Sequence, residues 1–354
     1  MSDVTKRTPF WIKIIGVSIP LFLFIAVSEL ALHLVDPDFY YKNQFFPINR
    51  DIDFPEIYKK DADLFWRFRE NITTRSKQFS YLTYQINSAG YRGPEFEREK
   101  NGYRILALGN SCTFGWGVEE EQTWVRQLDR ILGSRLNNDR YEVINAGVPG
   151  YSSHQGRIAF AKKLAVLKPD MVLVMFGWND HWAAGKGITD KEQQMPGGLI
   201  LGLQNFFSKM KLYQLMRKVI LSASEKQEFV ALGENTGKQR VSLQEYYLNL
   251  ACIAHTARKN GAHPVFMIPP VADPVNYFKG ATSQLHQIHR AYQEQMRLLA
   301  RQDNIPLIDL QAEFERYDNL YTDAYGDPTH FNERGHRVTA EAVAREVLPV
   351  LASR

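Results

Sequence analysis

The sequence has 354 residues, 44% of them hydrophobic, so it is long enough for one large domain with a substantial core and further attached segments. Its 43 basic and 39 acidic residues give a net charge of +4, and no Lys/Arg-rich run interleaved with aromatic residues occurs, which argues against nucleic acid as a partner. The two cysteines, Cys112 and Cys252, form neither a CxxC motif nor a Cys/His cluster, so neither a disulfide scaffold nor a zinc site is predicted.

The N-terminus has the pattern of a membrane anchor, because three basic residues come just before or at the start of an apolar run that extends to Val35: Lys6, Arg7 and Lys13. As a helix, residues 11–28 would be roughly 27 Å long at about 1.5 Å per residue, close to the hydrocarbon thickness of a bilayer. Positively charged flanks stay in the cytoplasm. We therefore expect a cytoplasmic N-terminus at residues 1–10, a transmembrane anchor at 11–35 with Glu29 and His33 near its outer interface, and the rest of the chain outside the cytoplasm.

A cleaved signal peptide is the main alternative for this segment. Ala26-Val27-Ser28 is an acceptable small-x-small cleavage site. The apolar pattern continues beyond that site, which favours the anchor, and the basic flank argues against a buried core helix.

Residues 36–100 are aromatic, charged and punctuated by proline, which is typical of a connecting segment that packs on a larger domain. Within them, the alternation from Phe79 to Ile86 predicts a strand, and Asn87-Ser88-Ala89-Gly90 has turn chemistry. We expect a short hairpin at this place.

From residue 101 to 354, short apolar runs alternate with amphipathic stretches, which predicts a three-layer α/β/α domain with a five-stranded parallel, flavodoxin-like sheet. The expected strands are Arg104–Leu108, Tyr141–Asn145, Met171–Phe176, Pro264–Ile268 and Pro306–Asp309. The expected helices are Thr123–Leu132, His154–Leu167, Leu243–Asn260 and Gln284–Gln302. Ligands of such sheets bind beyond the carboxyl ends of the strands.

One connection, an insertion at about 181–241, is much longer than the 2 to 6 residues that are usual between a strand and a helix. It carries an apolar stripe at helical spacing: Phe206, Phe207, Met210, Leu212, Leu215, Met216, Val219 and Ile220. Our preferred interpretation is that the stripe packs on the domain; covering a substrate or touching the membrane are the alternatives.

The strongest chemical signal lies at the ends of the predicted strands. The first strand ends in Gly109-Asn110-Ser111, which places a serine hydroxyl at the ligand-binding edge, although a serine after Gly-Asn is equally typical of a turn or a helix N-cap. The second strand ends near Gly147 and the third runs into Asn179, so a backbone N–H and a side-chain amide would converge there as an oxyanion hole requires. After the fifth strand come Asp327 and His330, and a histidine that a nearby carboxylate holds in one tautomer, close to a serine, can act as a general base.

Taken together, these blocks resemble the SGNH (GDSL-like) hydrolase superfamily, whose four motif blocks occur here in the family's order. They are Gly109-Asn110-Ser111, the Gly147 segment, Gly177-Trp178-Asn179-Asp180 and Asp327-Pro328-Thr329-His330, and the resemblance covers roughly residues 100 to 350. It implies that Ser111 is the nucleophile, His330 the base and Asp327 its orienter. It also implies an oxyanion hole of the Ser111 N–H, the Gly147 N–H and the Asn179 amide. Asn110 replaces the usual aspartate, which we interpret as tuning rather than loss of activity.

Other polar residues rank lower. Trp178, His181 and Trp182 are candidates for the substrate pocket, and Asp309 is a second choice as orienter of the histidine. The remaining residues are assigned structural roles: His286 and His289 a solvated helix face rather than a metal site, His336 packing, and Cys112 buried filling behind the nucleophile.

The sequence thus predicts a serine esterase without metal or organic cofactor, anchored in a bacterial inner membrane with its domain in the periplasm. Its expected substrate is an acyl ester, most simply an acetyl ester, of a cell-envelope or secreted polysaccharide or glycolipid. An O-acyltransferase with the same residues is one alternative, because pocket shape and dryness decide the acceptor. A non-catalytic binding or assembly protein is the other.

Overall fold

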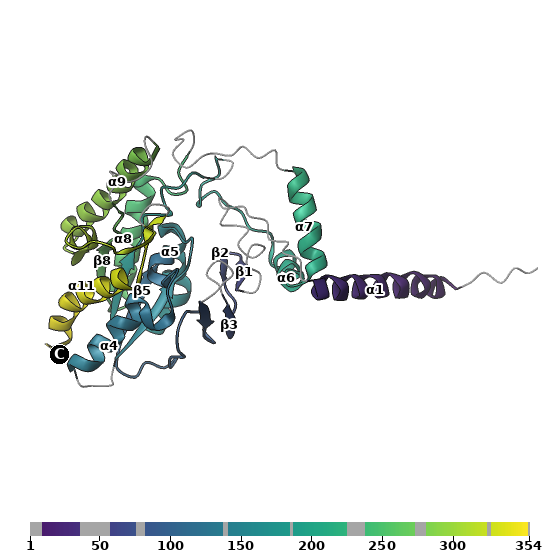
Figure 1. Cartoon of the computed structure of the whole chain (residues 1–354), viewed down its shortest axis with the longest axis horizontal. Helices are drawn as coiled ribbons and strands as arrows, with labels where there is room; N and C mark the ends of the chain where they lie inside the picture. Colours follow the sequence, from purple (N-terminus) through teal and green to yellow (C-terminus); the bar gives the residue numbers. More distant parts are fainter. Residues whose placement is uncertain are drawn as a thin grey trace, which may run out of the picture.

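The computed structural model describes residues 9–35, 57–75, 82–136, 141–184, 187–224, 238–272, 281–323 and 327–352 (Figure 1). At the centre is a sheet of five parallel strands in the order β6-β5-β7-β8-β9. Their bounds are Tyr103–Gly109 for β5, Tyr141–Gly147 for β6, Met171–Met175 for β7, His263–Ile268 for β8 and Leu307–Asp309 for β9. The predicted three-layer parallel α/β fold is confirmed.

Side chains of the central strands alternate between two cores because successive residues of a strand point to opposite faces. Leu106 and Leu108 of β5 join the core that includes residues of α8 (Leu243–Lys259) and α9 (Ala281–Gln302). Ile105 and Ala107 join the opposite core, with residues of α4 (Trp124–Leu136) and α11 (Glu333–Ala352). Both faces are therefore covered, and the carboxyl ends of the strands lie at one edge of the sheet.

The helices follow the predicted positions with local differences. The stretch expected as one helix from His154 consists of α5 (Ser153–Ala159), a π-helical turn η3 (Phe160–Leu164) and a 3-10 turn η4 (Ala165–Leu167). Helix α8 begins at Leu243 because Ser242 and Glu245 form a capping box that satisfies backbone N–H groups at its start. The shorter elements are α3 (Ser111–Phe114), η2 (Glu120–Gln122), α10 (Leu310–Phe314) and the strands β10 (Tyr321–Asp323) and β11 (Asp327–Phe331).

The connecting segment forms two small antiparallel sheets beside the domain. Strand β1 (Tyr58–Asp61) pairs with β2 (Phe65–Phe68), and β3 (Ile72–Arg75) pairs with β4 (Thr83–Ile86). The predicted turn after β4 is present: Ile86 forms an antiparallel bridge with Arg92, and the Asn87 N–H donates to the Tyr91 carbonyl at 2.9 Å. The pairing of β4 with the preceding strand β3 was not predicted. Residues 76–81, where that strand was expected to begin, lie outside the described residues. Arg92 also bridges to Asn145 of β6, which joins the segment to the main sheet.

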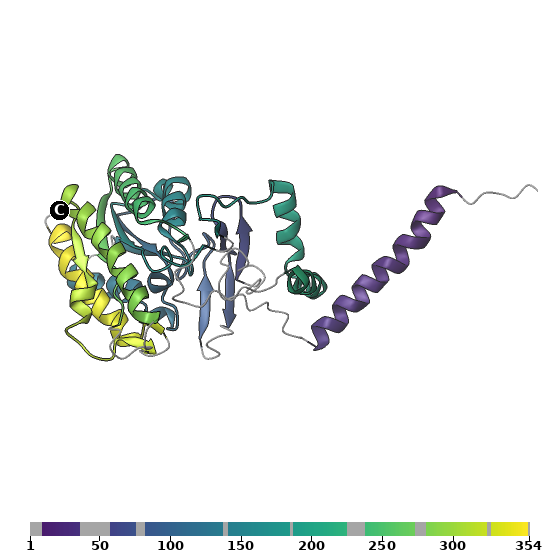
Figure 2. The same ribbon diagram turned by 90° about the horizontal axis from the view of Figure 1, so that it is seen from above.

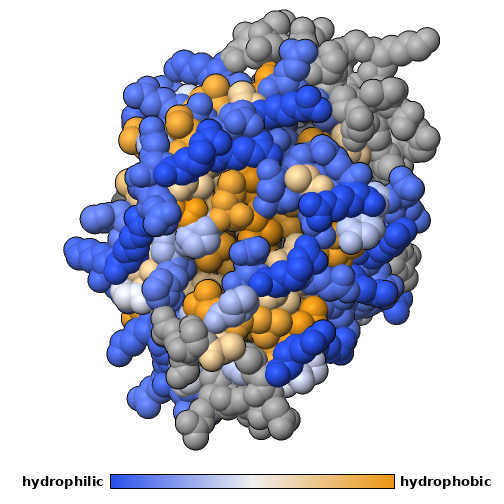
Figure 3. Space-filling model, turned by 90° about the vertical axis from the view of Figure 1, so that its left-hand side faces the viewer, coloured by the Kyte–Doolittle hydropathy of each residue, from blue (hydrophilic) through white to orange (hydrophobic). Residues whose placement is uncertain are grey.

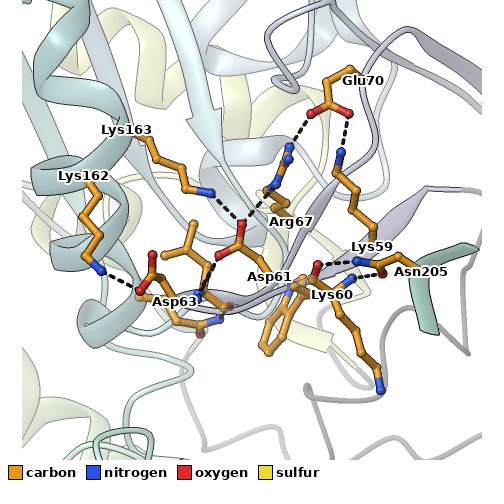
Figure 4. A network of polar contacts seen from close by, with 12 residues as sticks. Lys59, Lys60, Asp61, Asp63, Arg67, Glu70, Lys162, Lys163 and Asn205 are labelled. Carbon is orange, nitrogen blue, oxygen red and sulfur yellow. Dashed lines mark hydrogen bonds and ion pairs between the residues drawn. The ribbon is translucent and has the colours of Figure 1, made fainter. Parts of the chain in front are cut away.

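Ion pairs fasten the β1–β2 hairpin to its neighbours (Figure 4). Asp61 accepts from Lys163 of η3 at 2.5 Å and pairs with Arg67 at 3.1 Å, while Asp63 accepts from Lys162 at 2.5 Å. Burial opposes ionisation of Asp61, but its hydrogen bond with Lys163 leaves its pKa below the usual value. The hairpin is therefore held on the domain by charge as well as by its buried aromatic residues.

The insertion contributes helices α6 (Gly198–Phe207) and α7 (Lys211–Ser224). Its two ends meet at a bridge between Ala183 and Gln239, next to a buried ion pair of Asp190 and Arg240 at 2.8 Å. The preferred prediction that the apolar stripe packs on the domain is wrong for five of its eight residues, which are exposed: Phe206, Phe207, Met216, Val219 and Ile220. The described hydrogen bonds of α6 run to Lys60 and Arg69, beside the β1–β2 hairpin.

Helix α1 (Phe10–Val35) projects away from the rest of the molecule (Figures 1 and 2). It is long and apolar enough to cross a membrane, with a mean hydropathy of 2.3 over its most apolar 18 residues and none of that window buried. A signal sequence near the N-terminus can meet the same criteria of length and composition.

Candidate active site

The serine turn is built at the carboxyl end of β5, where Ser111 is the first residue of the single-turn helix α3. Asn110 is its N-cap, and the Asn110 Oδ1 accepts a hydrogen bond from the Cys112 N–H at 3.0 Å. Gly115 ends the turn in the left-handed conformation (φ 88°), and its N–H donates to the Ser111 carbonyl. A cap needs only a side-chain oxygen acceptor, so asparagine does the structural work of an aspartate here.

Two glycines let the serine turn lie against neighbouring strand ends. A Cβ on Gly109 would lie 2.1 Å from the Thr113 hydroxyl oxygen, and a Cβ on Gly147 would lie 2.2 Å from the Phe114 nitrogen. Neither position can hold a larger residue without moving the serine turn. Gly147 is therefore required for packing, whether or not it also binds substrate.

His330 connects the serine to a carboxylate. Its Nε2 lies 2.8 Å from the Ser111 Oγ, and its Nδ1 lies 2.5 Å from Asp327 Oδ2. Because an ionised carboxylate can only accept, Nδ1 carries the proton and Nε2 is left to accept from the serine hydroxyl. All three side chains named as a catalytic set from the sequence are thus in hydrogen-bond contact.

Asp327 is held in its charged form. Burial opposes its ionisation, but hydrogen bonds and charge from His330 and a hydrogen bond from Thr329 outweigh it and lower the pKa of Asp327 to about 2. Its Oδ1 accepts from the Thr329 hydroxyl at 3.0 Å and from the His330 N–H at 3.2 Å. Asp309, the second choice as orienter, instead accepts from Arg297 at 2.8 Å and caps α10 through the Ala312 N–H, so this alternative is wrong.

The predicted oxyanion donors differ in whether their N–H groups already donate a hydrogen bond within the protein. Asn179 Nδ2 donates one N–H to the Tyr151 carbonyl at 3.0 Å, which leaves its second N–H available. In the described part of the chain, the Ser111 N–H has no acceptor, as expected at the first position of a helix. The Gly147 N–H, in contrast, donates to Asn145 Oδ1 at 3.0 Å.

Gly150 is a further candidate donor, which the sequence does not single out. It has a positive φ of 82°, its carbonyl accepts from Arg240 at 2.9 Å, and it precedes Tyr151, which holds the Asn179 amide. Among the described residues its N–H has no acceptor. The Gly150 N–H is therefore uncommitted in the same loop in which the Gly147 N–H is committed. A Pro-Gly pair is an ordinary turn signal, so the sequence alone did not distinguish it.

Two of the predicted pocket residues, Trp178 and His181, form an aromatic group with His289. Trp178 is half-buried and meets His181 and His289 edge to face at ring-centroid distances of 5.0 and 5.1 Å. His289 Nε2 lies 3.0 Å from the Pro269 carbonyl and must donate to it, so its Nδ1 accepts from His181 Nε2 at 3.1 Å. Burial lowers the pKa of His181, and lowers that of His289 to about 4, so both rings are neutral. His181 is therefore a buried residue that packs against Trp178. Trp178 and Trp182 are themselves partly exposed.

The prediction of a solvated face for His286 and His289 is wrong, because both are buried in α9 and meet the backbone carbonyls of Ala272 and Pro269. His336 and Cys112 are buried as predicted. His336 Nδ1 accepts from the Trp124 N–H, and the Cys112 thiol, whose pKa burial raises, donates to the Thr329 carbonyl at 3.3 Å. Within the described ranges, no group of three or more His, Cys, Asp or Glu side chains could hold a metal ion.

Arg92 holds the far side of the serine turn and was not singled out from the sequence. It is 2% exposed, and its guanidinium donates to the carbonyls of Phe114, Gly115 and Val118 at 3.0, 2.6 and 2.7 Å and to Glu120 at 2.8 Å. It also lies over the rings of Tyr84 and Phe114. An arginine after a turn carries no sequence signal of such a role, because its acceptors are backbone groups of another segment.

Comparison with known proteins gives one family match. The family model of the GDSL-like lipase/acylhydrolase family matches residues 107–338. None of the curated proteins matches the chain.

Several solved structures are similar at low identity. A lipase/acylhydrolase from Enterococcus faecalis is 18% identical with a TM-score of 0.46, covering 69% of this chain and 95% of its own. An α/β hydrolase from the metagenome of Lake Arreo is 20% identical with a TM-score of 0.47, covering 70% and 96%. A catalytic mutant of an acetylxylan esterase from Geobacillus stearothermophilus is 18% identical with a TM-score of 0.46, covering 71% and 96%.

Proposed function

This chain belongs to the GDSL-like lipase/acylhydrolase family and is a serine ester hydrolase, and from this premise we propose that Ser111, His330 and Asp327 are its catalytic triad. The observation that carries the proposal is the position of His330, with Nε2 at 2.8 Å from the Ser111 Oγ and Nδ1 at 2.5 Å from Asp327. This is the arrangement in which a serine is activated by a histidine of fixed tautomer.

In the proposed reaction, His330 Nε2 takes the Ser111 proton while the serine oxygen attacks the carbonyl carbon of an ester. The tetrahedral intermediate collapses, the alcohol leaves with the proton from His330, and an acyl-Ser111 ester remains. Water, activated by the same Nε2, then attacks the acyl-Ser111 ester and releases the acid. Asp327 stays ionised and stabilises the imidazolium that forms in each half-reaction.

The oxyanion of the intermediate would be bound by the Ser111 N–H, by the second N–H of Asn179 and by one further backbone donor. The sequence assigned that third place to Gly147. We assign it to Gly150, because the Gly147 N–H is already bonded to Asn145 whereas the Gly150 N–H is uncommitted beside the Asn179 contact. Fixed donors aimed at the developing charge contribute strongly to catalysis.

We propose that α1 anchors the chain in a bacterial inner membrane with the catalytic domain in the periplasm. The support is the length and composition of α1 and the basic residues that precede it. A reporter that is active only in the periplasm, fused after residue 40, should be active, and extraction of the full chain should need detergent. Release of soluble protein lacking the first 28 residues would show a cleaved signal instead.

For this location we propose as substrate an acyl ester, most simply an acetyl ester, on a cell-envelope or secreted polysaccharide or glycolipid. The same acyl-Ser111 intermediate could pass its acyl group to a sugar hydroxyl instead of water. Trapping the acyl-enzyme with a short-chain ester and then adding either buffer alone or an oligosaccharide distinguishes hydrolysis from transfer.

The triad is tested with Ser111→Ala and His330→Ala. Each should abolish labelling by a fluorophosphonate probe and reduce ester turnover by several orders of magnitude, because either change disables the nucleophile. The matched control is Ser134→Ala, since Ser134 is an exposed serine on α4. Wild-type turnover by Ser111→Ala, with the variant folded as judged by circular dichroism, would show that the triad is assigned wrongly.

A further inference from the structure

Helices α6 and α7 are amphipathic in the opposite sense from the helices of a water-soluble domain. Polar side chains make the described hydrogen bonds between these helices and the rest of the protein, whereas most of their large apolar side chains are exposed. In a soluble protein the apolar stripe of a helix faces the core. The inversion indicates that something other than water covers the outer face of these helices.

In α6, the inward face consists of one buried apolar residue, Leu201, and polar groups that bind the β1–β2 hairpin. Asn205 Oδ1 accepts from the Lys60 N–H at 2.7 Å and its Nδ2 donates to the Lys60 carbonyl at 2.9 Å, while the Ser208 hydroxyl at the helix end accepts from Arg69 at 2.7 Å (Figure 4 shows the Asn205 contacts). Gln204 also accepts from Lys60. The outward face has the spacing i, i+1, i+4, i+7, i+8, which is one stripe of a helix. Its members are all exposed, Leu199 at 81% and Phe206 at 73% among them: Leu199, Ile200, Leu203, Phe206 and Phe207.

Helix α7 repeats the pattern. Gln214 is buried and donates to the Ser208 carbonyl at 2.9 Å, and Lys211 is also buried. Met216, Val219 and Ile220, at spacing i, i+3, i+4, are exposed to 56%, 60% and 60%. Both helices therefore turn an apolar stripe away from the domain.

The N-terminus of helix α7 is hydrogen-bonded to α1. The Glu29 carboxylate, the one acidic group in α1, accepts from the backbone N–H groups of Lys211 and Leu212 at 2.8 and 2.9 Å. A carboxylate at a helix N-terminus satisfies unpaired N–H groups and complements the helix dipole. This contact explains why a charged residue interrupts the apolar run. The contact also places the N-terminus of α7 beside Glu29, which the sequence predicts to lie near the outer membrane interface.

The net positive charge of α6 and α7 is suited to binding an anionic membrane surface. Between residues 198 and 224 there are four basic residues and no acidic one, and three of the four are at least partly exposed: Lys209, Arg217 and Lys218. Basic amphipathic helices are attracted to anionic lipid headgroups while their apolar stripe enters the acyl boundary.

The arrangement of the helices agrees with this. Helices α6 and α7 lie between the catalytic domain and α1, and α7 runs across the axis of α1 rather than along it (Figures 1 and 2). On the opposite end of the domain, hydrophilic side chains form the prominent ridges of the surface and apolar residues show mainly in the hollows between them (Figure 3).

We propose that α6 and α7 lie in the headgroup region of the bilayer that α1 crosses, with their apolar stripes at the boundary of the acyl chains. The proposal rests on the proposed anchoring by α1 and is independent of the chemistry at Ser111. The three helices then contact the membrane together: α1 crosses the bilayer, and α6 and α7 lie on the outer leaflet of the bilayer. This three-helix contact fixes the tilt of the catalytic domain relative to the membrane, which a single helix joined by a loop would not do.

The test measures the environment of single nitroxide labels on the full chain in vesicles of phosphatidylcholine and phosphatidylglycerol. In a Cys252→Ser background, which removes the exposed native thiol, labels are attached to Phe206→Cys and Val219→Cys. Leu23→Cys in α1 is the membrane reference and Leu248→Cys, 51% exposed on α8, is the water reference. Labelling of Ser111 by a fluorophosphonate shows that each variant is folded.

Collisions with oxygen, which concentrates in lipid, and with a water-soluble nickel complex report the position of each label. Labels at 206 and 219 should collide with oxygen more often, and with nickel less often, than the label at 248, with values between those of the labels at 248 and 23. A nickel-accessible label at 206 and 219, with 23 in lipid, overturns the proposal and leaves the anchor standing. Shielding from both reagents, or shielding that persists in detergent, overturns it in favour of a protein partner. If position 23 is itself in water, the anchor fails and the proposal fails with it, while the esterase activity is unaffected.

Discussion

Replacing Arg92 with methionine should destabilise the protein strongly, although Arg92 lies outside the part of the chain that matches the family. The substitution removes four hydrogen bonds and leaves Glu120 without its cationic partner at 2.8 Å. Removing one partner of a buried ion pair typically costs about 3–5 kcal/mol. Burial raises the pKa of Glu120 even with Arg92 beside it, so the Glu120 carboxyl of the variant should take up a proton more readily, and the loss should shrink as the pH is lowered.

The free energy of unfolding can be measured by denaturant titration in mild detergent, followed by tryptophan fluorescence. Arg130→Met is the matched control, because Arg130 pairs with Glu121 on the surface and exposed pairs contribute only about 0–1 kcal/mol. Arg92→Lys, which keeps the charge but cannot reach all four acceptors, should fall between the two. If Arg92→Met loses no more stability than Arg130→Met, the argument that Arg92 holds the serine turn is wrong.

Three further predictions concern groups at the strand ends. Asn179→Ala should lower kcat by roughly 10²- to 10³-fold with little change in KM, as for loss of one oxyanion donor; an unchanged kcat would remove Asn179 from the oxyanion hole. Asp327→Asn should keep the ring in place but favour the wrong tautomer, so we expect a large, incomplete loss of kcat across the pH range, and wild-type activity would contradict the assigned role. Burial raises the pKa of Asp180 from 3.8 to about 6, against the hydrogen bonds from Ser153. Its contribution to stability is therefore present below about pH 4 and lost as the pH rises through 6. Relative to Asp180→Asn, the wild type should lose roughly 2 kcal/mol between pH 4 and 7, out of roughly 3 kcal/mol for the whole shift at about 1.4 kcal/mol per pKa unit, and parallel pH profiles would contradict this.

The sequence predicts the sheet well because its strands are short, apolar and separated by amphipathic helices. Such strands are buried on both faces and can form little else. Ser111, Asp327 and His330 were found for a related reason, since each lies in a motif at a strand end or in a short tight turn. Their roles in catalysis stay predictions until the variants are measured.

What the sequence did not reveal depends on contacts between distant segments. The acceptors of Arg92 are backbone carbonyls of the serine turn, and the commitment of the Gly147 N–H depends on the rotamer of Asn145. The sequence favours a solvated face for His286 and His289 because no carboxylate or third histidine for a metal site is evident nearby, but both are buried and backbone carbonyls of Ala272 and Pro269 compensate their burial. The apolar stripe of the insertion was assigned to the core because periodicity identifies a face and not the solvent that it meets.

Asp327 and His330 lie three residues apart on the same short strand, β11, whereas Ser111 lies on α3. The acid and the base are therefore one rigid part, and the nucleophile is another. A displacement of the β10–β11 hairpin would separate His330 from Ser111 without disturbing the bond between His330 and Asp327. Inactivation of this kind would leave a histidine already in the correct tautomer, so that reactivation requires only a translation of the hairpin and no proton rearrangement.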